Sequence, residues 1–183
     1  MSLIPGSNSS NIALLFTLLH KEANGVYEFE DAIIQSSARL ERVKRTSSPG
    51  VVVAQLGVSE HLIDSLGKMA EREPWRFNSL LKVSLVRREL SYNTYLESID
   101  QVSEDIKEEI GDLKYRITLR RIANPDLRKA IVNEFGARLG GRVDLENYEF
   151  ELKIYYIDGK LMLVYPAKSS EVALQNYRLS REL

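Results

Sequence analysis

The hydrophobic and polar positions in the first half of the chain predict alternating strands and helices. An apolar run between polar residues, at 11–19, is typical of a buried strand. Residues at 62–70 recur at helical spacing behind a possible cap, Ser59. The expected elements are a strand at 11–19, a helix around 29–33, a basic strand at 39–45, a strand at 51–54, a helix at 62–70 and a strand at 80–88. This βαββαβ order predicts the ferredoxin-like fold, in which both helices cover one face of an antiparallel sheet.

The second half predicts two more helices, a strand and a hairpin. Its first helix buries residues spaced by three and four positions: Tyr95, Ile99, Val102, Ile106 and Ile110. In the strand at 113–122, apolar residues alternate with cations, which predicts one core face and one cationic face. Asn124 as N-cap and Pro125 open the next helix, and Asp158-Gly159 turns a hairpin between strands at 150–156 and 161–165.

These elements predict an α+β protein with two domains. We assign residues 11–88 to the ferredoxin-like domain and residues 89–169 to an α/β domain. Residues 1–10 are expected to be a disordered or tag-like N-terminus, and residues 170–183 a polar C-terminal tail. The apolar run after the N-terminus is too short for a membrane anchor and follows no basic region, so we expect neither a signal peptide nor a membrane partner.

Composition excludes several classes of chemistry. The chain has 183 residues, 44% of them hydrophobic, which is enough for a substantial core. It has no cysteine, which rules out a disulfide framework, a thiolate zinc site and a cysteine nucleophile, and fits a cytoplasmic location. Its 25 Lys and Arg nearly cancel 26 Asp and Glu, so the net charge of −1 by itself does not indicate a polyanionic partner.

The near-neutral total conceals two charged blocks. Residues 89–112 carry eight acids and one lysine, a net charge of −7, whereas residues 113–142 carry eight cations and two acids, a net charge of +6. Six of those eight cations are arginines, whose planar groups suit phosphate oxygens and base edges. Two interpretations stay open: a basic patch for an anionic partner, or an acidic helix that lies over the basic strand and neutralises it.

The second block also resembles a known family. The run from Tyr92 to Ala167 combines an acidic helix, the strand KYRITLRRI, a helix ending in EFGARLGGR, the triplet Val143-Asp144-Leu145 and a hairpin. In this order it resembles the THUMP domain of tRNA-modifying proteins, which a ferredoxin-like unit normally precedes. The resemblance implies that the two units together bind tRNA at the acceptor stem and its single-stranded 3′ end.

A free-standing protein of this layout is similar to the small THUMP adaptor of tRNA cytidine acetylation. The resemblance therefore implies a non-enzyme that presents tRNA to a separate acetyltransferase, which forms 4-acetylcytidine. Phosphates and unpaired bases need cations and flat side chains. The expected RNA-binding residues are Lys114, Arg116, Arg120, Arg121, Lys129, Arg138 and Arg142. Tyr148 and Tyr155 are candidates for stacking on bases, and Lys82, Arg87 and Arg88 for an extension of the basic track.

No sequence motif indicates catalysis, a cofactor or a metal. A Walker A loop, a dinucleotide-binding glycine pattern and a His/Cys zinc signature are missing. His20 and His61 are far apart, and we interpret both as structural. Two alternatives remain: a ferredoxin-like ligand-sensing or dimerisation module with structural charge pairs, or an enzyme of unrecognised type with a deep pocket. The sequence leaves the oligomeric state open.

Overall fold

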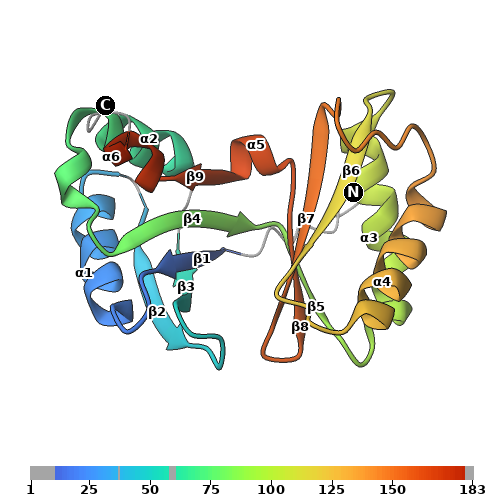
Figure 1. Cartoon of the computed structure of the whole chain (residues 1–183), viewed down its shortest axis with the longest axis horizontal. Coiled ribbons are helices and arrows are strands. Elements are labelled where there is room, and N and C mark those ends of the chain that lie inside the picture. Colours follow the sequence, from blue (N-terminus) through green and yellow to red (C-terminus); the bar gives the residue numbers. More distant parts are fainter. Residues whose placement is uncertain (1–10, 37, 58–60, 180–183) are drawn as a thin grey trace, which may run out of the picture.

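The chain forms four layers, helices, sheet, sheet and helices, in a computed structural model that describes residues 11–36, 38–57 and 61–179 (Figure 1). The expected N-terminal segment 1–10 and the expected cap Ser59 lie outside these described residues. Within the described ranges no helix is long and apolar enough to cross a membrane. The predicted α+β class is confirmed.

The first sheet has the strand order β2-β3-β1-β4-β9 and carries its helices on one face. Its elements are β1 (Ile12–Thr17), α1 (Glu22–Ile33), β2 (Leu40–Arg45), β3 (Val51–Leu56), α2 (Leu62–Arg72), the short 3₁₀ turn η1 (Pro74–Arg76) and β4 (Leu80–Val86). Alternate residues of the central strands, such as Leu15 and Val83, pack under the helices together with Phe29. The predicted ferredoxin-like βαββαβ order is present, and its neighbouring strands are antiparallel.

The C-terminal segment returns to the first sheet. After α5 (Ala167–Ser170), strand β9 (Glu171–Ala173) pairs with β4, and α6 (Gln175–Leu179) follows. The prediction of a polar tail from residue 170 is therefore wrong for residues 171–179. Two isolated apolar residues, Val172 and Leu174, are buried in the first core, and a three-residue strand is too short to show an alternating pattern.

The second sheet has the order β5-β8-β7-β6 and carries its own two helices. Its elements are β5 (Arg88–Ser91), α3 (Tyr95–Ile110), β6 (Tyr115–Arg120), α4 (Pro125–Leu139), β7 (Phe150–Ile157) and β8 (Lys160–Val164). The predicted caps and turn are present: Asn124 Oδ1 accepts hydrogen bonds from the backbone of Asp126 and Leu127, and Asp158-Gly159 has positive φ angles. The strand expected at 80–88 ends at Val86. The chain passes directly from it into β5 of the second sheet, a strand that was not predicted.

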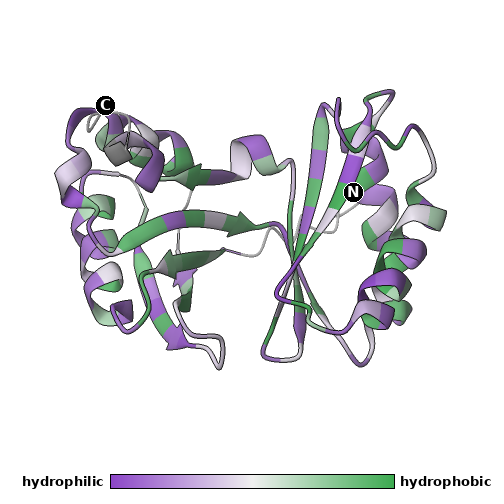
Figure 2. Cartoon of the chain, in the orientation of Figure 1, coloured by the Kyte–Doolittle hydropathy of each residue, from purple (hydrophilic) through white to green (hydrophobic). Residues whose placement is uncertain are grey.

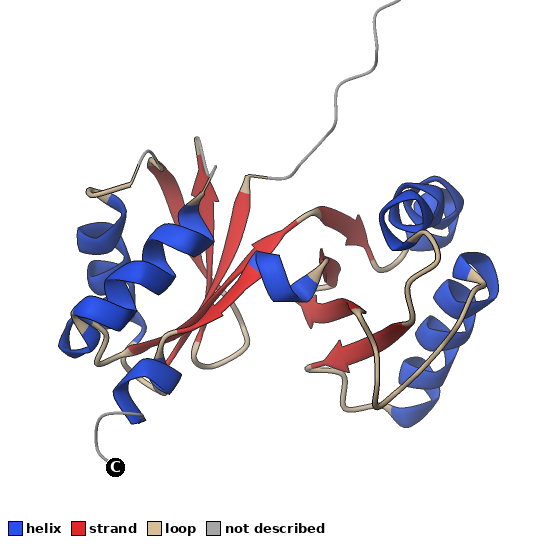
Figure 3. Ribbon diagram, turned by 90° about the horizontal axis from the view of Figure 1, so that it is seen from above, coloured by secondary structure: helices blue, strands red, loops and turns tan. Residues whose placement is uncertain are grey.

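The two sheets face each other on the sides that their helices leave open (Figures 1 and 3). Leu14, Val51 and Val86 of the first sheet pack against Tyr155 and Met162 of the second in a third apolar cluster. Hydrophobic residues lie along much of β1 and β4, whereas the outer faces of α3 and α4 are largely hydrophilic (Figure 2). Away from the apolar cluster, the facing strands carry polar side chains, which form the candidate site.

Candidate nucleic-acid interface

The cationic face of β6 looks toward the first sheet. Tyr115 and Leu119 point into the second core under α3 and α4, so the alternating residues Arg116, Thr118 and Arg120 lie on the opposite, open face. They stand beside Glu151, Lys153 and Tyr155 of β7 in parallel register. Strand parity therefore placed Arg116 and Arg120 on the face that the sequence predicted.

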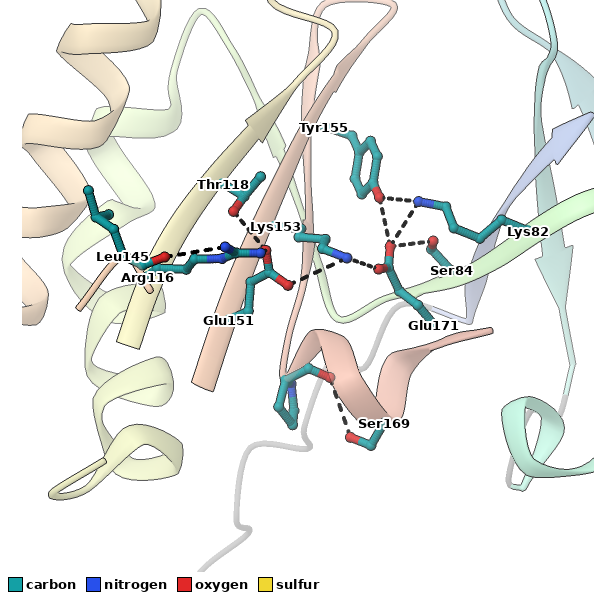
Figure 4. A network of polar contacts seen from close by, with 11 residues as sticks. Lys82, Ser84, Arg116, Thr118, Leu145, Glu151, Lys153, Tyr155, Ser169 and Glu171 are labelled. Atoms are coloured by element: carbon teal, nitrogen blue, oxygen red, sulfur yellow. Dashed lines mark hydrogen bonds and ion pairs between the residues drawn. The ribbon is translucent and has the colours of Figure 1, made fainter. Parts of the chain in front are cut away.

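A polar chain crosses from β6 to the first sheet, and we call it the junction network (Figure 4). Its members are Lys82, Ser84, Arg116, Thr118, Glu151, Lys153, Tyr155 and Glu171. Arg116 Nε and Thr118 Oγ1 donate to Glu151 Oε1 at 2.9 and 2.7 Å. Lys153 Nζ lies 3.5 Å from Glu151 Oε2 and also binds Glu171, so cations and carboxylates alternate along the chain.

Glu171 is the centre of this network on the side of the first sheet. Ser84 Oγ and Tyr155 Oη each donate to Glu171 Oε1 at 2.6 Å, and Lys82 Nζ lies 3.3 Å from the same oxygen. Burial opposes ionisation of Glu171, but Lys82 and the other donors outweigh it and hold the pKa below its usual value. Burial also lowers the pKa of Lys82 and raises that of Tyr155.

An open groove of about 840 Å³ lies along this network. Its lining includes Tyr148, three lysines (Lys82, Lys153, Lys168) and four glutamates (Glu146, Glu149, Glu151, Glu171). The Arg116 guanidinium stacks 3.7 Å from the centre of the Tyr148 ring, so a flat cation and a flat aromatic ring are presented together. These groups suit a partner with phosphates and unpaired bases.

Arg120, the last residue of β6, and Arg121, which follows it, continue the cationic face. Both side chains are exposed. Arg121 adopts φ 61°, and its Nη1 donates to the Pro49 carbonyl at 3.5 Å, while its guanidinium carbon lies 5.9 Å from the Phe16 ring centre. Lys82 Nζ lies 4.1 Å from the same ring, so cations from both sheets converge on Phe16. The junction network, its groove and the end of β6 thus carry six cations (Lys82, Arg116, Arg120, Arg121, Lys153, Lys168) and four carboxylates (Glu146, Glu149, Glu151, Glu171), an excess of two positive charges.

The other four predicted cations lie elsewhere. Lys114, just before β6, forms an ion pair with Asp144 at 3.1 Å. Arg142 is exposed, and its backbone carbonyl accepts a hydrogen bond from the Tyr115 N–H at the start of β6. Lys129 and Arg138 belong to α4, which covers the other face of the sheet. The structure therefore groups Arg116, Arg120 and Arg121, with Lys114 and Arg142 at the far end of the strand, and separates Lys129 and Arg138 from them.

The acidic helix α3 does not neutralise the cationic face of β6, because it lies on the opposite side of the sheet. Among the described residues, its ion pairs reach Arg87, Arg88 and Arg138 as well as its own Lys107. Asp105 lies 2.7 Å from Arg88, and Glu109 lies 3.4 Å from Arg87. Pairing with α3 therefore accounts for Arg138, Arg87 and Arg88, whereas in β6 Arg116 pairs with Glu151 of the neighbouring strand.

Sequence reasoning missed the acids and lysines that complete the site. Lys153 has the outward parity of the hairpin and could have been found by that signal, whereas Glu171 gave none. The suggestion that Tyr155 stacks on bases is wrong, because its side chain is 1% exposed. Tyr155 points away from the core of its own sheet, but the first sheet covers it.

No group of three or more metal-binding side chains occurs within the ranges that the structure describes.

Comparison with known proteins identifies the fold. No family model matches the sequence, and no curated protein matches it. Among solved structures, PH1313 from Pyrococcus horikoshii Ot3 has a TM-score of 0.59 at 13% identity, covering 89% of this chain and 55% of that chain. The class defined here is therefore a two-unit α+β fold shared with proteins of very different sequence.

Two further solved structures share the fold. A 4-thiouridine synthetase, whose structure is of an RNA complex with bound ATP, has a TM-score of 0.55 at 15% identity, covering 88% of this chain and 41% of that chain. TrmN from Thermus thermophilus has a TM-score of 0.51 at 14% identity, covering 84% of this chain and 45% of that chain. The chain thus spans about half the length of the structures that it matches, and at these identities the likeness concerns the fold alone.

Proposed function

We propose that this protein binds tRNA on its inter-sheet face and takes part in tRNA modification. The observation that carries the proposal is the orientation of β6: Arg116, Arg120 and Arg121 face the open junction of the two sheets and not the acidic helix. The fold likeness to a 4-thiouridine synthetase captured with RNA, and the resemblance of the second unit to a THUMP domain, support the same ligand.

The chemistry of the face fits a single-stranded end joined to a duplex. The excess of cations attracts phosphates, and the Arg116–Tyr148 stack offers planar surfaces for exposed bases. Glu151 and Glu171 are buried and already bound, so they hold the lysines and Arg116 in position. Glu146 and Glu149 are exposed at the same groove, so the cations that reach phosphates there are Arg116 and the arginines at the end of β6.

The finer proposal is an adaptor role. On this proposal the protein is not itself the enzyme, and it presents the acceptor stem and 3′ end of tRNA to a cytidine acetyltransferase that forms 4-acetylcytidine. Its support is the similarity of the layout to the stand-alone THUMP adaptor.

A binding titration with fluorescent tRNA tests the first proposal. Affinity should fall steeply as salt is added, because each neutralised phosphate releases counterions, and it should weaken when the 3′ end is trimmed. The variant Arg120→Glu with Arg121→Glu should lose at least about tenfold in affinity and give a shallower salt slope. The control is Lys68→Glu with Arg72→Glu, the same charge change on the exposed face of α2. Equal losses in both variants would place the RNA elsewhere.

Reconstitution tests the adaptor role. Purified acetyltransferase, tRNA and an acetyl donor should form 4-acetylcytidine efficiently only when this protein is added, and the Arg120→Glu, Arg121→Glu variant should not restore the yield. Acetylation that proceeds equally without the protein would refute the adaptor role but leave tRNA binding to the titration.

A further inference from the structure

Strand β2 is an open edge of the first sheet, at the far end from β9 (Figure 1). It pairs with β3 on one side, and within the described part of the chain no strand pairs with its other side. Such an edge presents a row of backbone N–H and C=O groups that can pair with an added strand.

An apolar groove runs beside this edge. Two adjoining hollows of about 460 and 330 Å³ lie between α1 and β2 and share Glu30 and Val43. They exist because α1 packs mainly against β1, β3 and β4, and α2 against β4 and β9, which leaves the inner side of β2 incompletely covered. Leu40 and Val43 are only partly buried there.

Two large apolar side chains, one in α1 and one at the residue that caps its C-terminus, stand exposed at the same groove. Tyr27 and Ile34 are 75% and 80% exposed, and their spacing of seven residues places them along one side of the helix. Exposed apolar groups grouped at a groove are typical of a protein-binding surface.

The strand beside the groove is strongly cationic. Arg39, Arg42, Lys44 and Arg45 are all exposed, with Glu41 as the acid among them, while Glu22 and Glu30 of α1 line the groove itself. Among the described residues, Lys44 lies 3.9 Å from Asp158, and Arg39, Arg42 and Arg45 form no ion pair. Arg42 and Lys44 lie on the face of β2 opposite Val43, so that face is complementary to acidic side chains, while the groove is complementary to apolar ones.

We propose that β2 and α1 form a docking edge for an extended acidic peptide of a protein partner. The peptide adds antiparallel or parallel to β2, alternate apolar side chains enter the groove against Leu40, Val43 and Ile34, and the acidic side chains between them meet Arg42 and Lys44 on the opposite face. A nucleic acid fits less well, because it has no amide backbone to extend a sheet and no aliphatic side chains for the groove. The groove opens on the helix side of the first sheet, whereas Arg42 and Lys44 face the second sheet beside Glu89 and Lys160, so the test includes an oligonucleotide as well as peptides.

The test uses the full chain and synthetic peptides of six residues, the length of β2. The probe alternates Val and Glu and has blocked ends. One comparison peptide replaces Glu by Lys. Two others are N-methylated at every second residue, one at the Val positions and one at the Glu positions, so that each lacks the N–H groups along one of its two edges. The Val/Glu peptide should bind and slow amide hydrogen exchange at 40–45, whereas the Lys peptide and at least one N-methylated peptide should bind much more weakly.

Variants of the protein separate charge from groove. Arg42→Glu with Lys44→Glu should weaken the Val/Glu peptide about tenfold, because two surface attractions become repulsions. Ile34→Ser should weaken it several-fold without loss of folding, since that side chain is mostly exposed. The Lys68→Glu, Arg72→Glu variant should bind like wild type.

Three results would overturn the proposal. If none of the peptides protects β2, its arginines act only to keep the edge free of partners. If a single-stranded oligonucleotide protects 40–45 and the Val/Glu peptide does not, the edge belongs to RNA. If the protein instead self-associates with increasing concentration and protects β2 in doing so, the occupant is a second copy.

Discussion

Replacing Glu171 by glutamine removes the central charge of the junction network and nearly preserves its volume. The Glu171 side chain is 7% exposed, and those of Lys82 and Lys153 are 25% and 18% exposed. The substitution leaves both ammonium groups beside a neutral amide in a half-buried site. Because Glu171 begins β9, the loss acts where the C-terminal segment joins the first sheet.

The magnitude follows from this burial. Breaking a fully buried ion pair costs about 3–5 kcal/mol, because a charge is left without compensation. Here water reaches both lysines, so we expect a loss of about 2–3 kcal/mol in the free energy of unfolding. In urea this corresponds to a midpoint lower by about 1 M at an m-value of about 2–3 kcal/mol per M.

The pH dependence identifies the cause. The pKa of Glu171 is lowered in the folded protein from 4.5, so its stabilising effect is present above that pH and is lost as the pH falls through the lowered value. The difference between wild type and Glu171→Gln should therefore shrink in acid. The control Glu108→Gln, on the exposed face of α3, should match wild type. A Glu171→Gln midpoint equal to wild type, or a difference that does not change with pH, would refute the reasoning.

Three further changes test the fold. Asn124→Ala removes the cap that binds the backbone of Asp126 and Leu127 at 2.9 and 3.1 Å, and urea unfolding should show a loss of about 1 kcal/mol; no loss would mean that water replaces the cap. Phe135→Ala empties a fully buried site in the second core and should cost about 3–5 kcal/mol, measured in the same way; a loss below 1 kcal/mol would contradict the packing. Burial raises the pKa of Tyr165 from 10.0 to about 12, so the folded state keeps this proton longer and stability should fall as the pH rises between those values; a Tyr165→Phe variant should show a smaller fall, and an unchanged slope would contradict the burial.

Much of the fold follows from local patterns in the sequence. Alternation along 113–122 separated Arg116 and Arg120 from Tyr115, and helical spacing identified the buried side of α3, because both patterns repeat over several residues. Caps and turns were equally readable, since Asn124 and Asp158-Gly159 act through bonds and backbone angles close in sequence. Strands β5 and β9 were not predicted, because four and three residues carry too little pattern.

Local sequence patterns determined only part of the candidate site. The sequence selected the cationic strand, and the charge blocks posed the question of whether the acidic helix neutralises it. Only the tertiary structure decided that question, because it puts α3 on the core side of the sheet and turns Arg116 toward Glu151 and the first sheet. Glu171 reaches the same site from the C-terminal segment through pairing across 87 residues with Ser84. A local pattern fixes which face a side chain takes, but only the packing of distant segments fixes what stands opposite that face.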